Sequence, residues 1–219
     1  MLGAPPGIDL EAIRASQIAA IDSRKLSPGV WRASSHVHPS AACACPLPFP
    51  PSPLIAQIFS NNIYIVSVII GKLLIEKGIN PTYAAGHSLG EYSALTLAES
   101  FNFEDGLELV KVRALGMQKA CENNSGSMAA ILGLEDNIVE EICESYKNGV
   151  VVAANFNAKG QVVISGEKDA IKNIMVEMLD AGAKKAIELK VSGAFHSPLM
   201  SSAKKILAEK LLSAKINNS

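Results

Sequence analysis

A serine flanked by two glycines is the pattern in this chain best suited to covalent chemistry. Residues 86–90 read Gly-His-Ser-Leu-Gly, and an apolar, helix-forming stretch follows directly. This spacing suits a sharp turn from a strand into a helix, because small residues let the backbone turn tightly and push the hydroxyl of Ser88 outward. The N–H groups at the start of that helix would stabilise the oxyanion that forms when a serine attacks an acyl carbon. The pattern predicts acyl chemistry through a covalent serine intermediate.

A serine nucleophile needs a general base, and the chain contains four histidines. His87 is adjacent to Ser88, and neighbouring side chains diverge at such a turn. His36 and His38 lie in a Pro-rich stretch that does not fix their position. His196 follows a run of small residues, in a loop that can bring an imidazole across a cleft to a serine. Because a serine–histidine pair is the minimum for nucleophilic acyl transfer, Ser88 and His196 are predicted as the catalytic residues.

Composition and charge exclude several other functions. The chain has 219 residues, of which 48% are hydrophobic and 19% charged, with a formal net charge of −1. This composition predicts a globular protein, and the charge offers no basis for binding nucleic acid or an anionic membrane. The most apolar segment, 63–75, is expected to be too short for a membrane span. The four cysteines form no paired CxxC motifs, so we expect no metal site, reduced thiols and a cytoplasmic location. A monomer is expected.

The first part of the chain differs in character from the rest. Residues 1–53 are expected to form a poorly ordered, Pro-rich leader, in which residues 9–22 could make one short helix and residues 27–53 are expected to contain no regular core element. From residue 54 onward, a buried helix over 54–77 ending at Gly78, a strand over 81–85 and a helix over 91–97 are predicted. An amphipathic helix is predicted over 104–123. This order indicates the core of a parallel α/β arrangement.

The residues that follow predict a different succession of strands and helices. Strands are predicted over 127–134, 150–155, 161–165 and 186–191, with helices over 135–146 and 168–181 between them. Residues 157–160, Asn-Ala-Lys-Gly, have the residue types of a hairpin turn. The resulting order βαββαβ is that of a ferredoxin-like unit.

Five sequence blocks resemble one family in order and spacing. They are GHSLGEYSAL, KVRALGMQ, GSMAAILGL, ANFNAKGQVVISG and KVSGAFHSPLM. Together they resemble the bacterial malonyl-CoA:acyl carrier protein transacylases, from about residue 54 to the C-terminus. The resemblance implies an α/β fold, with a parallel-sheet serine acyltransferase core formed by 54–125 and 190–219. Residues 126–189 would form its ferredoxin-like subdomain.

The resemblance also implies a reaction in fatty-acid biosynthesis. Malonyl would pass from coenzyme A to the serine and then to the phosphopantetheine thiol of acyl carrier protein, with no cofactor. Coenzyme A thioester and acyl carrier protein would be the partners.

The resemblance assigns a role to each matched site residue. Ser88 matches the nucleophile and His196 the base. Arg113 matches the arginine that binds the free carboxylate of malonyl, because a guanidinium grips a carboxylate through two hydrogen bonds. The N–H of Leu89 matches an oxyanion donor. The side chains expected to line the substrate site are those of His87, Leu89 and Phe195.

Two departures from the family pattern leave alternatives open. The family begins with a Gly-Gln-Gly loop that supports the oxyanion hole, and the Pro-rich stretch stands in its place here. The sequence ends at Ser219, before the family's segment that orients the imidazole. The chain is therefore expected to transfer malonyl more slowly than an intact member, and an inactive fragment is one alternative.

A serine esterase or thioesterase is the other alternative. An α/β-hydrolase would need an acid between Ser88 and His196 in chain order. The candidates, none of them in a recognisable loop after a strand, are Asp105, Asp136, Asp169 and Asp180.

Overall fold

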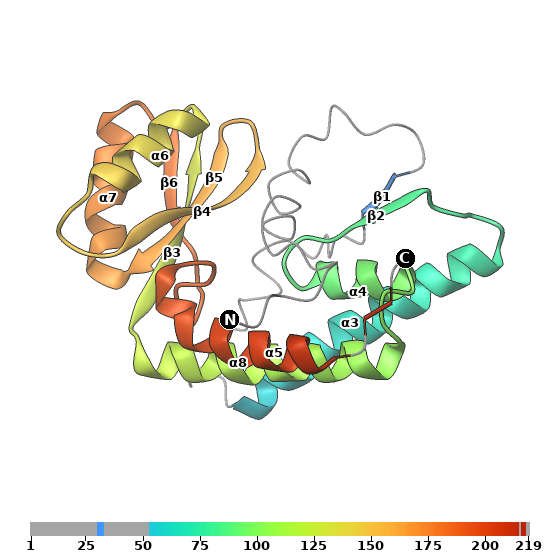
Figure 1. Cartoon of the computed structure of the whole chain (residues 1–219). Helices are drawn as coiled ribbons and strands as arrows, with labels where there is room; N and C mark the ends of the chain where they lie inside the picture. Colours follow the sequence, from blue (N-terminus) through green and yellow to red (C-terminus); the bar gives the residue numbers. More distant parts are fainter. Residues whose placement is uncertain (1–29, 33–52, 215, 218–219) are drawn as a thin grey trace, which may run out of the picture. The chain divides into compact units, whose positions relative to one another are not determined.

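The computed structural model describes residues 30–32, 53–214 and 216–217 of the chain (Figure 1). Contacts divide these residues into two compact units, one containing residues 60–110 and the other residues 111–212. The helices are α3 (Pro53–Glu76), α4 (Gly90–Leu97), α5 (Phe103–Asn123), α6 (Asp136–Ser145), α7 (Lys168–Asp180), η1 (Pro198–Met200) and α8 (Ser201–Ser213). The strands are β1 (Val30–Arg32), β2 (Tyr83–Ala85), β3 (Gly126–Leu132), β4 (Val151–Ala158), β5 (Gln161–Glu167) and β6 (Lys185–Glu188). The expected domain boundaries at 53, 125 and 189 stay predictions.

Helix α3 has the predicted length but only one of its faces is packed. The Tyr64 hydroxyl lies 2.7 Å from Thr96 Oγ1 and donates to the Phe103 carbonyl at 3.0 Å. A Cβ on Gly71 would overlap the Leu97 side chain, so the helix approaches α4 closely there. The helix ends where Gly78 adopts φ 84°, as predicted. The N–H of the next residue bonds to the carbonyl four positions before Gly78, as in a Schellman motif.

The opposite face of α3 is exposed, so the expectation of a buried helix is wrong. Val66, Ile69, Ile70 and Leu73 are 53%, 49%, 53% and 52% exposed. Apolar density alone predicted burial on all sides, because composition does not reveal how many neighbours a helix has.

The expected limit on apolar length is also wrong for α3. The stretch Leu54–Glu76 is long and apolar enough to span a membrane, judged by length and composition alone. Its most apolar part has a mean hydropathy of 1.8, and 11% of that part is buried. The sequence-based expectation considered only residues 63–75, whereas the helix extends beyond them, over Pro53–Glu76. The Tyr64 contacts described above pack one face of this helix against α4 and the start of α5.

The predicted strand before Ser88 forms a parallel pair. β2 pairs with β1 in the register Val30↔Tyr83 and Arg32↔Ala85. The expectation of no regular core element in residues 27–53 is wrong for β1, whose Val-Trp-Arg sequence contains two residues that favour strands. The rest of that expectation lies outside the described residues. Parallel pairing among the described residues is limited to these two strands, so the larger parallel core stays a prediction.

The ferredoxin-like unit is confirmed in its order of elements and in its topology. The sheet has the strand order β4-β5-β3-β6, and every neighbouring pair is antiparallel. The predicted turn is a two-residue connection, because Ala158 pairs with Gln161 around Lys159 and Gly160. β6 is shorter than predicted and ends at Glu188. Its last residue accepts a 2.8 Å hydrogen bond from the Ser127 hydroxyl of β3.

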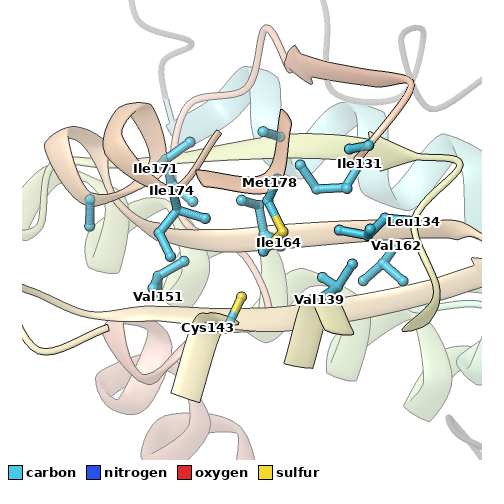
Figure 2. Packing of buried hydrophobic residues seen from close by; sticks show 13 residues of the cluster. Ile131, Leu134, Val139, Cys143, Val151, Val162, Ile164, Ile171, Ile174 and Met178 are labelled. Carbon is cyan, nitrogen blue, oxygen red and sulfur yellow. The ribbon is translucent and has the colours of Figure 1, made fainter. Parts of the chain in front are cut away.

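Helices α6 and α7 cover this sheet through a single apolar cluster (Figure 2). Ile164 of β5, Val139 of α6 and Ile174 of α7 are each 0% exposed. Burial, together with the negative charges of the neighbouring Glu140 and Glu144, raises the pKa of the Cys143 thiol to about 12. This thiol therefore stays protonated and unreactive near neutral pH.

Removing side-chain volume from this cluster is expected to destabilise the unit strongly. Ile164→Ala should lower the free energy of unfolding by about 2–5 kcal/mol, because it removes buried methylene groups and leaves a cavity. Urea denaturation measures the loss. Val176→Ala is the matched control, since Val176 lies on α7 but is 58% exposed, and it should change stability by less than about 0.5 kcal/mol. Equal losses in the two variants would contradict this packing.

Candidate active site

The turn between β2 and α4 places Ser88 in a strained backbone conformation. Ser88 has φ 55°, in the left-handed region that residues other than glycine seldom occupy. A Cβ on Gly86 would overlap the backbone of Gly90 and Glu91. The backbone at Gly86 therefore passes very close to the backbone at Gly90, and Ser88 lies at the tip of the tight turn between them. This geometry confirms the predicted strand–turn–helix context of the motif.

The first turn of α4 gives this tip its electrostatic character. The Gly90 N–H donates to the His87 carbonyl at 3.0 Å, and the Tyr92 N–H donates to the Leu89 carbonyl at 3.2 Å. Leu89 is the N-cap residue, and its own N–H donates to no residue in the described part of the chain. A helix N-terminus with an available N–H stabilises a negative charge that develops nearby. The role of the Leu89 N–H as an oxyanion donor stays a prediction.

Replacing Gly86 is expected to disrupt this turn. The Cβ of Gly86→Ala meets backbone atoms, which cannot move aside as a flexible side chain does. A displacement of the Ser88 hydroxyl by about 1 Å should lower the rate of Ser88 acylation roughly 100-fold. Mass spectrometry of the acylated protein over time measures that rate. In the control Gly116→Ala the new Cβ has its nearest neighbour at 3.4 Å, so its rate should match the wild type.

His196 lies in the second unit, in the loop between β6 and η1. It is partly buried and has φ 59°, so both predicted catalytic residues are non-glycine residues in the left-handed region. The described residues contain one other non-glycine residue of this kind, Glu99, at the end of α4. Backbone strain of this type costs about 1–3 kcal/mol and concentrates at functional sites.

The small residues before His196 are explained by close packing. A Cβ on Gly193 would overlap the Cys121 sulfur atom of α5. A Cβ on Gly126 would lie 2.5 Å from the Ala194 Cβ. The loop therefore rests directly on the end of α5 and the start of β3. The reach of this loop across a cleft to Ser88 stays a prediction; what the structure adds is that its small residues let it lie against α5 and β3.

Arg113 and Phe195 also belong to the second unit. Arg113 lies in the part of α5 that follows Val110 and is partly buried. The Phe195 side chain packs against a small cluster formed by Ala120, Met200 and Ala203. This contact adds support for the backbone that carries His196.

The structure brings the predicted site residues together in two groups. His87, Ser88 and Leu89 share the turn in the first unit, whereas Arg113, Phe195 and His196 belong to the second. The pairing of Ser88 with His196 and the roles of Arg113, Phe195 and His87 stay predictions.

The second unit also contains a polar hollow of about 380 Å³. Its lining includes neither Arg113 nor His196, and it is formed by residues such as Cys121, Ser127, Lys168, Glu188 and Ser192. Ser127 and Glu188 bond to each other there, which joins the first strand of the sheet to the last. In the described part of the chain, no three His, Cys, Asp or Glu residues lie close enough to hold a metal ion.

Comparisons with known proteins show which family the chain resembles. The acyl transferase domain family matches residues 62–219 of the chain. Over 126 residues the chain is 44% identical to a malonyl CoA-acyl carrier protein transacylase of Staphylococcus aureus, covering 57% of this chain and 41% of that protein. Over 135 residues it is 46% identical to the transacylase of Salmonella typhimurium, covering 61% and 44%.

Solved structures are similar over a longer stretch. An acyl carrier protein S-malonyltransferase from Vibrio cholerae has a TM-score of 0.71 at 39% identity, covering 74% of this chain and 54% of that one. A type II PKS malonyl-transacylase in complex with its acyl carrier protein has a TM-score of 0.70 at 37% identity, covering 74% and 53%. The chain thus spans about half the length of these structures and somewhat less of the curated relatives.

Proposed function

Since this chain belongs to the acyl transferase domain family, we propose that it transfers malonyl from coenzyme A to acyl carrier protein through an acyl-enzyme on Ser88. The reaction would supply fatty-acid biosynthesis with its extender unit. The observation that carries the proposal is the left-handed Ser88 between Gly86 and Gly90, at the N-terminus of α4.

The proposed reaction has two half-reactions on the same serine. In the first, Ser88 Oγ attacks the thioester carbon of malonyl-CoA and His196 takes the hydroxyl proton. An ester C–O bond forms between Ser88 Oγ and the malonyl carbon, the thioester C–S bond breaks, and the proton passes from His196 to the coenzyme A thiolate. In the second, the phosphopantetheine thiol of acyl carrier protein gives its proton to the imidazole and attacks the ester carbon. The C–O bond then breaks, and Ser88 recovers its proton from His196.

The oxyanion of each half-reaction needs a donor close to Ser88. The Leu89 N–H is the candidate, because it lies at the N-terminus of α4 and donates to no described residue. A single oxyanion donor of this kind contributes on the order of 10²–10³ in rate.

The partners of the proposed reaction follow from the relatives. Two similar proteins are named as transacylases that act between malonyl-CoA and acyl carrier protein. A third was solved in complex with its acyl carrier protein. We propose these two substrates for this chain, and a cytoplasmic location in keeping with them.

A two-step transfer assay tests the proposal. The purified chain is incubated with malonyl-CoA, and mass spectrometry follows a malonyl-sized increase on the peptide that contains Ser88. Holo-acyl carrier protein is then added, and the malonyl group should leave the peptide and appear on the carrier. Release of free malonate instead would indicate a hydrolase, and the absence of any Ser88 adduct would overturn the proposal.

A further inference from the structure

Ser197 makes contacts that the proposed chemistry does not use. It follows His196 directly and is buried, at 8% exposure. Its hydroxyl donates to the Ala194 carbonyl at 2.7 Å, and the same oxygen accepts the Leu199 N–H at 3.3 Å. Its own carbonyl accepts the Met200 N–H at 3.0 Å. These hydrogen bonds connect Ser197 to the residues on both sides of His196 in the chain.

The elements on either side of these bonds are themselves fixed. Ser197 is the N-cap of η1, with Pro198 in the first turn. The Asn124 amide at the end of α5 donates to the Leu199 carbonyl at 3.2 Å and to the Ala120 carbonyl at 3.1 Å. η1 also contacts β5 of the ferredoxin-like sheet. The bonds of Ser197 therefore join the strained residue to a rigid support.

A left-handed histidine persists only where its surroundings hold it. Relaxation to a negative φ would turn the imidazole in another direction. The Ala194 carbonyl before His196 and the Leu199 N–H after it both bond to the Ser197 hydroxyl, so this one oxygen spans the strained residue. Without the hydroxyl, two backbone groups in a mostly buried loop would lose this partner, which favours rearrangement of the loop.

We propose that Ser197 is a positioning residue, which holds the His196 imidazole in its catalytic orientation by bracing the left-handed backbone. Asn124 assists from α5 by holding the carbonyl of Leu199. This inference rests on the proposed function for its catalytic consequence, whereas the orientation of His196 is measurable without any reaction.

The first arm of the test observes the imidazole itself. Ser197→Ala is compared with the wild-type chain by NMR of the histidine ring signals, with the His196 signal assigned from its loss in His196→Gln. The His196 signal should shift or split in Ser197→Ala, because the backbone leaves its single conformation. Ser202→Ala is the matched control, as Ser202 is exposed nearby on α8, and it should leave the signal unchanged.

The second arm measures malonyl transfer. Ser197→Ala should lower kcat roughly 10- to 100-fold with KM for malonyl-CoA unchanged, since a misdirected base slows proton transfer without affecting binding. Ser197→Thr retains the hydroxyl and should recover most of that loss. Asn124→Ala should lower kcat in the same direction by a smaller factor, and it provides the test where Ser197→Ala does not fold.

The possible outcomes separate the two proposals. An unchanged His196 signal together with an unchanged kcat in folded Ser197→Ala would overturn the positioning role. A loss of transfer that Ser197→Thr does not recover, with the His196 signal unchanged, would also overturn it. Transfer that survives Ser88→Ala would instead overturn the proposed function, and the NMR arm would still decide the role of Ser197.

Discussion

Ser88→Ala is expected to abolish the malonyl adduct completely. The wild-type chain should gain a malonyl-sized mass on the peptide that contains residue 88, and the variant should gain none. The physical reason is that alanine has no atom that can form the ester bond, so the covalent route is lost rather than slowed. Intact-protein and peptide mass spectrometry after incubation with malonyl-CoA measures both.

A serine on α4, the helix that follows Ser88, provides the control for this result. The hydroxyl oxygen of Ser93 is buried and makes no hydrogen bond among the described residues, so Ser93→Ala removes a similar group at little cost to the fold. This variant should acylate like the wild type. An adduct that persists in Ser88→Ala would assign the nucleophile to another residue.

Arg113→Ala is expected to change which acyl group is transferred. Losing a charge-assisted, bidentate pair with the malonyl carboxylate should cost on the order of 2–4 kcal/mol. That loss corresponds to a roughly 30- to 1,000-fold lower kcat/KM for malonyl transfer. Acetyl has no free carboxylate, so acetyl transfer should be unchanged or faster. Parallel assays with malonyl-CoA and acetyl-CoA give the ratio.

Two further variants separate recognition by Arg113 from general effects of charge. Arg113→Lys keeps the positive charge but not the planar pair of donors, so it should recover only part of malonyl transfer. Lys119→Ala removes a positive charge from an exposed position on the same helix, so it should leave the rates of both malonyl and acetyl transfer unchanged. Equal losses for malonyl and acetyl in Arg113→Ala would show that the arginine has a structural role.

The local elements were predictable because their signals are local. The succession of short strand-like and helix-like runs, with the Lys159–Gly160 turn, predicted the ferredoxin-like unit, and the order of its elements follows the prediction. The turn at Ser88 was predictable from the spacing of Gly86 and Gly90. In each case neighbouring residues impose the geometry, through a steric limit or through a period of side chains.

What sequence reasoning missed depends on distant contacts. The exposed face of α3 could not be predicted, because apolar residues do not indicate whether another element covers them. The pairing of β1 with β2 joins residues about 50 positions apart. The bracing by Ser197 also went unnoticed, although its position before a proline is a recognisable sign of a helix start.

The exposed face of α3 has a consequence for the thermodynamics of unfolding. Val66, Ile69, Ile70 and Leu73 are each about half hydrated in the folded chain. Unfolding therefore exposes less new hydrocarbon in this region than in a unit where such a helix is fully enclosed. The heat-capacity change of unfolding and the slope of the unfolding free energy against denaturant concentration both scale with newly exposed surface. Both are therefore smaller here for the length of chain involved. The stability of this region accordingly varies less with temperature, since the curvature of its stability curve is set by that heat capacity.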